Sequence, residues 1–423
     1  MDKITLLHAA DLHIDSPMHG LVAYEGSPAE TVRTATRNAF ESLVSTAIEE
    51  KVDLLLIAGD LYDGDWKDYN TGLFVIDRLS ELNANNIRVV IIQGNHDAQS
   101  QLTKKLRFPP NTTLLGSKEP EVRIFDDLGV AVYGQSYPTR DTSDNIAANY
   151  PKGDLGLINI GMLHTCFDGT LGHDRYAPCG LDTLKSKGYD YWALGHVHKR
   201  KIIDTDPYIV FPGNLQGRHI RETGPKGASL VTFTDGEPSL DELVLANVRW
   251  EHCYVDISEA KSLEDCISTC YEQLESTCVD GSKTYAVRIE FTGNTNLTGM
   301  LQEKITHLTN EIRAMSLDFH KAPIWIEKVK VSSFYEKSLG TFANNELLGE
   351  LKEIAQTIKT DLPSLLSDNN PLSVISSLKN KINTAEQYGL DDFLSTQHLA
   401  NMTDEAVSML AYLLKIQGVD NED

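Results

Sequence analysis

The stretch LLLIAGDLYD, residues 54–63, decides the fold of this chain. It is a continuous apolar run that ends abruptly at Gly59 and Asp60. An uninterrupted apolar run is typical of a strand that is covered on both faces, as in the parallel sheets of α/β proteins. Such sheets place their functional groups at the carboxyl ends of their strands. The stretch therefore predicts a buried central strand that delivers Asp60 to a site.

Four other short motifs follow apolar runs within the first 200 residues. Each places histidine, aspartate or asparagine at the point where the run turns polar. One such motif would be weak evidence, but five in this order predict that they build a single site. The four are DLH at residues 11–13, GNHD at 94–97, the lone His164, and GHVH at 195–198.

The segments between these motifs predict an α/β fold. Up to residue 93, apolar strands alternate with helices at 31–50 and 69–82, whose apolar residues recur at helical spacing. Beyond Pro109 the pattern changes to shorter strands. The predicted strands are 4–10, 52–58, 87–93, 122–125, 130–133, 155–164, 191–194, 208–211 and 229–234. This order predicts two packed sheets with helices on the outside, closing near residue 245.

The rest of the chain predicts two further domains. A β-α-β-α-β order, with strands at 250–257, 284–291 and 324–331 and helices at 262–275 and 297–315, predicts a small α+β domain. An amphipathic helix follows from Leu347, Pro363 and Pro371 interrupt it, and a last helix runs from its Thr403 cap to Gln417. We therefore expect domains at 1–245, 246–335 and 336–423, the last forming either a small core or a docking surface.

The composition limits the classes of partner. The formal net charge is −23, whereas a protein that grips nucleic acid unaided usually shows a basic face. Bound cations, a local basic strip or a partner would therefore have to attract a polyanionic substrate. No run approaches the roughly 18 apolar residues of a membrane span, so we expect no membrane. The six cysteines lack metal-finger spacing, which together with the absence of a cleavable signal predicts reduced thiols in the cytoplasm.

The residue types in the five motifs suit two divalent cations that act on a phosphoester. Two cations roughly 3.5–4 Å apart need one carboxylate that bridges them, with imidazole and oxygen ligands on either side. Asp60 is the natural bridge because it follows the central strand. If the backbone stayed extended, His196 and His198 would share a face and could serve adjacent metals. The predicted ligands are Asp11, His13, Asp60, Asn95, His164, His196 and His198.

These seven residues and their order resemble the calcineurin-like metallophosphoesterases, and among them the DNA repair exonucleases of the SbcD and YhaO type. The segment FPGNLQGRHIRETGPKG, residues 211–227, resembles the YhaO branch, and RYAPC, residues 175–179, resembles a stretch that these nucleases share. The resemblance covers most of residues 1–245 and continues more weakly to about 335. It implies a four-layer fold, two mixed sheets flanked by helices, with a small α+β capping domain and a C-terminal helical segment.

The resemblance also implies roles for the residues. Asp60 would bridge two divalent ions, Mn²⁺ in preference to Mg²⁺. A metal-activated water would attack the phosphodiester while His96 protonates or stabilises the leaving oxygen. Archaeal and eukaryotic relatives carry a histidine where Asp63 stands here, so we predict that Asp63 orients His96. The first metal would be held by Asp11, His13, Asp60 and His198, and the second by Asp60, Asn95, His164 and His196.

The function that the resemblance implies is an exonuclease on duplex DNA ends in DNA repair. It would act with a coiled-coil ATPase of the SbcC or YhaN type, docked on the C-terminal segment, and could form a homodimer. The alternative is a small-molecule phosphodiesterase, against which the extra 180 or so residues argue. A phosphoprotein phosphatase is less favoured because Gly64 and Ala98 stand where that group has arginines. A non-catalytic scaffold is disfavoured by the intact Asp60, His96 and His198.

A small group of basic residues accompanies the last predicted ligands. In an acidic protein, positive charges beside a metal site would guide phosphates into it. The alternative is ordinary surface charge. The predicted substrate-binding residues are Lys199, Arg200, Arg218, His219 and Arg221. Of the histidines outside the motifs, His8 is predicted to be a packed core residue because it lies inside the first strand.

Overall fold

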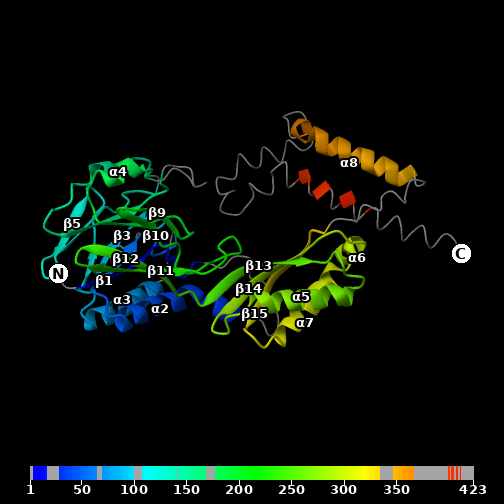
Figure 1. Cartoon of the computed structure of the whole chain (residues 1–423), viewed down its shortest axis with the longest axis horizontal. Helices are drawn as coiled ribbons and strands as arrows, with labels where there is room; N and C mark the ends of the chain where they lie inside the picture. Colours follow the sequence, from blue (N-terminus) through cyan, green and yellow to red (C-terminus); the bar gives the residue numbers. More distant parts are fainter. Residues whose placement is uncertain are drawn as a thin grey trace. The chain divides into compact units, whose positions relative to one another are not determined.

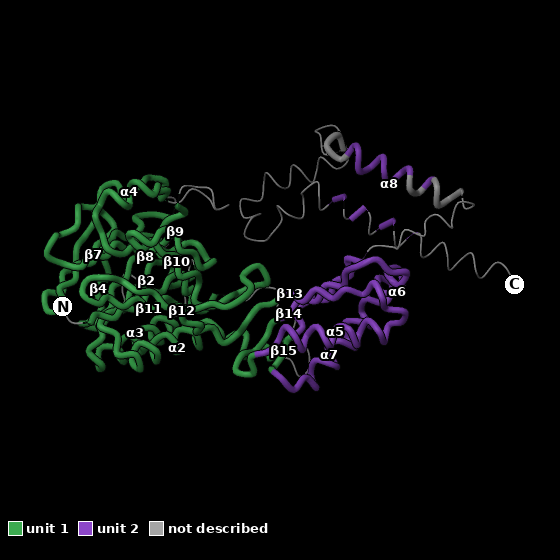
Figure 2. Tube along the Cα trace, in the orientation of Figure 1, with its two compact units in different colours: residues 1–251, 280–286, 322–325 green, residues 252–279, 287–321, 326–423 purple. Residues whose placement is uncertain are grey.

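The computed structural model describes residues 3–16, 28–63, 69–99, 107–140, 142–167, 177–333 and 346–365, and scattered residues between 399 and 410. The chain divides into two compact units (Figure 2). The first comprises residues 1–251, 280–286 and 322–325. The second comprises residues 252–279, 287–321 and 326–423. Arg175, Tyr176, Pro371 and most of the predicted helix 403–417 lie outside the described residues.

Two six-stranded mixed sheets form the first unit (Figure 1). The first sheet has the order β12-β11-β1-β2-β3-β4, in which β1 to β4 run parallel and β11 and β12 run antiparallel to their neighbours. Its strands are β1 Ile4–Ala9, β2 Leu54–Ala58, β3 Arg88–Ile92, β4 Thr112–Leu114, β11 Gly227–Thr234 and β12 Glu237–Val244.

The second sheet has the order β5-β6-β7-β8-β10-β9. Its four inner strands are parallel, and the two outer ones pair antiparallel with them. The strands are β5 Glu121–Phe125, β6 Val130–Gly134, β7 Ile158–His164, β8 Tyr191–Gly195, β9 Lys201–Thr205 and β10 Tyr208–Phe211. His8 of the first sheet is fully buried and bonds Tyr191 and Leu194 of the second, which confirms it as a core residue.

The central strand β2 shows how the layers are held together. Leu54, Leu56 and Ala58 belong to the core between the two sheets, whereas Leu55 and Ile57 belong to the core beneath the helices. Burying such a side chain fully contributes about 1.5–3 kcal/mol. Helices α2 Ala35–Glu49 and α3 Tyr69–Ala84 cover the first sheet, whereas the short α1 Ala29–Arg33 packs through Val32 in a cluster with Val248 and Trp250. The second sheet is covered by α4 Leu181–Lys185 and short 3₁₀ turns at Asp97–Gln99 and Ile146–Asn149. The predicted arrangement of two packed mixed sheets flanked by helices is confirmed.

A third, three-stranded sheet has the order β13-β14-β15. Alternating helices complete the predicted β-α-β-α-β order, and Ser262 and Asp265 form a capping box at the start of the first of them. A long helix then follows in the C-terminal segment. These elements are β13 Val248–Asp256, α5 Leu263–Thr277, β14 Thr284–Thr292, α6 Thr298–Glu303, α7 Ile305–Leu317, β15 Ile324–Val331 and α8 Glu346–Leu365. All six cysteines lie within the described residues, and they are buried thiols that form no disulfide with one another.

Two predicted helix limits are wrong. The helix expected at 31–50 divides at Thr34, whose hydroxyl donates to the carbonyl of Glu30 at 3.0 Å and so competes with the regular helix pattern. Helix α8 passes through Pro363 and ends at Leu365. A proline lacks the backbone N–H that would donate one helical hydrogen bond. Because α8 ends two residues after Pro363, only its last turn is affected.

Candidate metal centre

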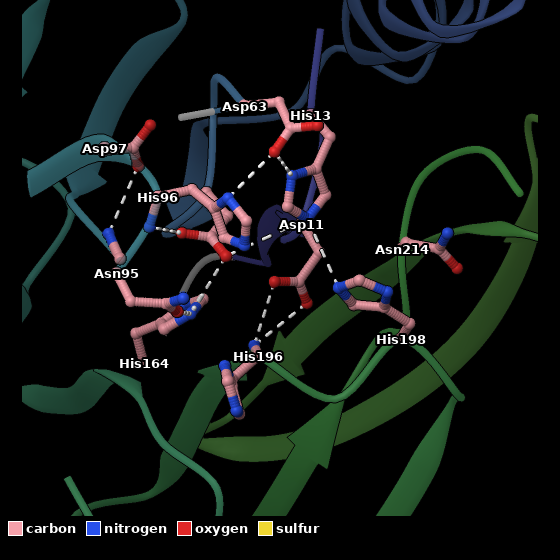
Figure 3. Close-up of polar contacts among 12 residues, drawn as sticks. Asp11, His13, Asp63, Asn95, His96, Asp97, His164, His196, His198 and Asn214 are labelled. Carbon is pink, nitrogen blue, oxygen red and sulfur yellow. Dashed lines mark hydrogen bonds and ion pairs between the residues drawn. The ribbon is translucent and has the colours of Figure 1, made fainter. Parts of the chain in front are cut away.

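The five motifs meet at the carboxyl ends of β1, β2 and β3 in one sheet and of β7 and β8 in the other (Figure 3). This is the edge at which parallel strands deliver ligands. The candidate side chains point toward one another from both sheets in the close-up. All seven predicted ligands lie in this cluster, and six of them are buried, His198 being half-buried.

Asp60 lies between two groups of possible ligands. Its Oδ2 atom is 3.4 Å from Nε2 of His164 and 3.9 Å from Nε2 of His13. Asn95 places Oδ1 3.0 Å from Nε2 of His164. Asp60 therefore reaches both groups, as a bridging carboxylate must. Groups whose donor atoms lie within 4.8 Å of one another are Asp11 with His13 and His198, Asp60 with His164 and His196, and His13 with Asp60 and His96.

Backbone strain is concentrated at these positions. Four of the predicted ligands have positive φ angles, namely Asp11 at 52°, His13 at 44°, Asp60 at 52° and His196 at 100°. Residues other than glycine rarely adopt this region, and such strain of about 1–3 kcal/mol per residue clusters at functional sites. The rest of the fold therefore stabilises an unfavourable backbone conformation at these four residues, and this conformation directs their side chains toward one another.

The condition under which His196 and His198 would share a face, an extended backbone through Gly195–His198, is not met. Strand β8 ends at Gly195, and the positive φ of His196 turns the chain. The amide of His196 donates to both carboxylate oxygens of Asp11 at 3.0 Å, which holds this turn. His196 and His198 nevertheless reach different groups, one with His164 and the other with His13. The turn at His196 therefore still allows the two histidines to serve adjacent metals.

Neighbouring acceptors orient two of the imidazoles. Nδ1 of His164 lies 3.0 Å from the carbonyl of Ala58, and Nδ1 of His198 lies 2.6 Å from Oε1 of Glu222. Because a carbonyl and a carboxylate only accept, the imidazole Nδ1–H donates in each pair. Each ring therefore turns Nε2 toward the cluster, the arrangement that fixes metal-binding histidines.

The donor chemistry fits divalent cations. Nε2 of His13 faces Nε2 of His198 at 3.3 Å, so two ring nitrogens converge on one point where at most one of them can donate to the other. A cation accepts lone pairs from both. The fully buried carboxylates of Asp11 and Asp60 lie among these rings, and buried charges of this kind are paired or coordinate metals.

The pKa values reflect the crowding of charge. Burial lowers the pKa of His164, but the charge and hydrogen bond of Asp60, the charge of Asp11 and the hydrogen bond to the Ala58 carbonyl together raise it to about 9. Burial and the charge of Asp60 together raise the pKa of Asp97 to about 7. Asp97 accepts backbone amides from Leu61 at 3.1 Å and Tyr62 at 2.9 Å, so it ties the loop after β3 to the loop after β2.

His96 and Asp63 form a pair at the open side of the cluster. Nδ1 of His96 lies 2.8 Å from Oδ1 of Asp63, the contact that the predicted orienting role requires. Burial alone would raise the pKa of Asp63, but hydrogen bonds from His13 and His96 and the charge of Arg218 hold it far below its usual range. The His96 side chain is 20% exposed, so it faces both the cluster and the solvent. The catalytic roles of the pair remain predictions.

The five predicted substrate-binding residues do not share one surface. Arg218 is half-buried and forms ion pairs with Asp63 and Glu222 inside the site. Arg200 donates to the hydroxyl of Ser229 and lies 3.3 Å from Glu242, so its charge is already engaged. His219, Arg221 and Lys199 are exposed or half-exposed.

Sequence reasoning missed three residues that support the site. Glu222 and Asp97 orient ligand loops, and Asn214 donates to Oε2 of Glu222 at 2.9 Å. Asp97 was signalled by its place in the GNHD motif beside Asn95. Asn214 and Glu222 lie in the segment that resembles the YhaO branch, but nothing in their spacing shows that they meet His198.

Replacing Gly195 with alanine should damage the site by displacing its backbone. A Cβ at this position would lie 1.9 Å from the carbonyl oxygen of Ala58 and 2.9 Å from Nδ1 of His164. We expect a loss of about 1–3 kcal/mol or more in the free energy of unfolding, because overpacking against backbone has no soft partner. Chemical denaturation measures this loss. Gly156→Ala is the control, because a Cβ at this position would meet only Oδ1 of Asp154 at 3.5 Å, an ordinary contact, and stability should stay nearly unchanged.

Comparison with known proteins agrees with this geometry. Residues 4–200 match the family model described as calcineurin-like phosphoesterase, and residues 250–333 match the middle domain of metallophosphoesterase YhaO. The chain is 36% identical over 281 residues to the metallophosphoesterase YhaO of Bacillus subtilis, covering 66% of this chain and 68% of that protein.

Two more distant relatives are archaeal proteins named DNA double-strand break repair protein Mre11. The one from Saccharolobus solfataricus is 28% identical, with 57% of this chain and 63% of that protein covered. The one from Methanopyrus kandleri is 26% identical, with 58% and 57% covered. The chain thus spans less than two thirds of the length of either Mre11 protein. By its family models, its identity to YhaO and its paired ligand groups, the chain belongs to the calcineurin-like metallophosphoesterases and is a metal-dependent phosphoester hydrolase with candidate ligands for a dinuclear centre.

Proposed function

We propose that this protein is a DNA nuclease, an exonuclease that acts on duplex ends in DNA repair with Mn²⁺ as its metal. The observation that carries the proposal is the position of Asp60 between two ligand groups, with His96 and Asp63 at the open side. The names of the Mre11 relatives support DNA as the substrate. The name of the YhaO relative supports hydrolysis of a phosphoester.

The residues divide the chemistry between them. When bound, two divalent cations neutralise charge on the phosphoryl oxygens and supply a nucleophile at neutral pH. Asp11, His13 and His198 would hold one cation, and Asn95, His164 and His196 the other, with Asp60 shared. His96 would donate a proton to the leaving oxygen through Nε2, because Asp63 occupies Nδ1 at 2.8 Å.

The acidic surface supports a second protein in the reaction. With a net charge of −23, the chain repels a polyanion at a distance, and the basic residues near the site are few or already paired. We propose that a coiled-coil ATPase of the SbcC or YhaN type supplies DNA attraction and docks on the C-terminal segment. The exposed side chain of Ile354 on α8 offers an apolar contact for it. Within the described residues, no helix is long and apolar enough to span a membrane.

Hydrolysis with defined metals and substrates tests this proposal. We expect linear duplex DNA to be degraded with Mn²⁺, circular single strands to be cut more slowly, and EDTA to stop both reactions. The same assays should include the small diester bis(p-nitrophenyl) phosphate and be repeated with the partner ATPase. Hydrolysis of the small diester without any DNA degradation, even with the partner present, would show that the substrate is a small phosphodiester.

A further inference from the structure

Glu222 is a buried carboxylate that several polar groups of the centre contact. Oε1 lies 2.6 Å from Nδ1 of His198 and 3.3 Å from the Arg218 guanidinium. Oε2 accepts from the amide of Asn214 at 2.9 Å and from the backbone N–H of Arg218 at 2.7 Å. The side chain is 6% exposed. Donors other than His198 therefore hold this carboxylate in place. Because its position does not depend on His198, it can set the orientation of that ring.

Arg218 connects Glu222 to the other end of the site. Its NH1 atom lies 3.6 Å from Oδ2 of Asp63 and 3.4 Å from the hydroxyl of Ser16. That hydroxyl in turn donates to Oδ2 of Asp63 at 2.6 Å. Because the guanidinium contacts a carboxylate on each side and its side chain is only 14% exposed, it has little freedom to turn toward a substrate phosphate.

The contacts form one continuous chain through the site. It runs from His198 through Glu222 and Arg218 to Asp63, and Asp63 holds His96. One end is a candidate metal ligand, and the other is the candidate donor to the leaving oxygen. Arg218 keeps its charge at every accessible pH, so it joins the two carboxylates permanently.

We propose that Glu222 and Arg218 are positioning residues, which fix the orientations of His198 at one end of the centre and of His96 at the other. Glu222 aims Nε2 of His198 at its cation, and Arg218 keeps Asp63 placed to hold His96. The role of Arg218 toward His96 rests on the proposed phosphodiester hydrolysis, whereas the role of Glu222 toward His198 requires only metal binding. The role proposed here for Arg218 thus differs from the direct contact with substrate phosphate that the sequence predicts for it.

Metal affinity tests the role of Glu222. We expect Glu222→Gln to weaken Mn²⁺ binding by isothermal titration calorimetry roughly 10-fold to 100-fold, the usual effect of removing the acceptor behind a metal-binding histidine. The control is another arginine–carboxylate pair, Arg288 and Glu327, which is half-buried, with side chains 19% and 16% exposed, and bonded at 2.6 Å. Glu327→Gln should bind Mn²⁺ like the wild type. Equal affinity in Glu222→Gln and wild type would overturn this part.

Leaving-group dependence tests the role of Arg218. With saturating Mn²⁺, we compare thymidine 5′-(p-nitrophenyl phosphate), whose leaving group departs without a proton, with thymidylyl-thymidine, whose sugar oxygen needs one. Arg218→Gln should lower kcat roughly 10-fold to 100-fold on the dinucleotide and change kcat on the aryl ester little, because it impairs proton donation alone. Arg218→Lys should recover part of the loss, and Arg288→Gln should match the wild type on both substrates.

The outcomes separate this inference from its alternatives. An equal loss of kcat on both substrates would overturn the link to His96. A rise in KM with kcat unchanged would also overturn it and would favour the phosphate contact predicted from the sequence. If the wild-type protein hydrolysed neither diester, the proposed function would fail, while the calorimetry on Glu222→Gln would still decide whether that residue serves the metal.

Discussion

Replacing Asp60 with asparagine should lower hydrolysis of bis(p-nitrophenyl) phosphate by more than about 10³-fold. Asp60 is buried and within 4 Å of a nitrogen in each ligand group. Asparagine keeps the shape but loses the charge that the two cations would share. Metal ions contribute several kcal/mol of charge stabilisation to such a reaction, and each 1.36 kcal/mol is tenfold in rate. The loss of either cation therefore accounts for the expected size.

Thermal unfolding provides a second measurement of the Asp60 variant. A ligand that binds only the folded state raises the melting temperature, so Mn²⁺ should stabilise the wild type and EDTA should reverse this. Asp60→Asn should lose most of the shift. Asp53→Asn is the control, because Asp53 lies at the opposite end of the same strand, where it accepts the amide of Thr5 at 2.8 Å. A full Mn²⁺ shift in Asp60→Asn would contradict a bridging role.

Much of the fold follows from strands that are buried on both faces. In β2, alternate side chains enter two different cores, so the strand is apolar throughout and easily found in the sequence. The missed strands are polar edges or short. Strand β12 is mostly exposed and mixes charged and polar residues with apolar ones, without a continuous apolar run. Its hairpin with β11 turns at Asp235 and Gly236, whose φ angles of 51° and 87° suit a tight turn.

The convergence of the ligands could be predicted because strand ends of parallel sheets meet. The contacts that support the ligands could not be predicted, because they depend on side-chain positions that the sequence pattern does not specify. Arg218 illustrates the difference. Its charge and its place after a Pro-Gly turn predict a phosphate contact, whereas the fold encloses it between Asp63 and Glu222. The turn at His196 is similar, since a positive φ of 100° at a non-glycine residue has no sequence signal.

Replacing His96 with alanine should lower kcat on DNA by roughly 10²-fold to 10⁴-fold, the usual contribution of a general acid. The loss should be smaller on bis(p-nitrophenyl) phosphate, because p-nitrophenolate leaves without a proton. Asp63→Asn should show the same substrate dependence with a smaller loss, since it removes the carboxylate that holds Nδ1 at 2.8 Å. The two substrates are compared under the same saturating Mn²⁺ for each variant.

The geometry also allows a competing role for His96, and Mn²⁺ titration of the same variant distinguishes the two. His96 has a ring nitrogen within 4.8 Å of donor atoms of His13 and Asp60, as a metal ligand would. If His96 acts on the leaving oxygen, His96→Ala should bind Mn²⁺ as tightly as the wild type and lose activity mainly on DNA. If it is a ligand, affinity should fall and both substrates should suffer alike. Its Nδ1 is engaged by Asp63 and its ring is partly open to solvent, and both observations favour the first result.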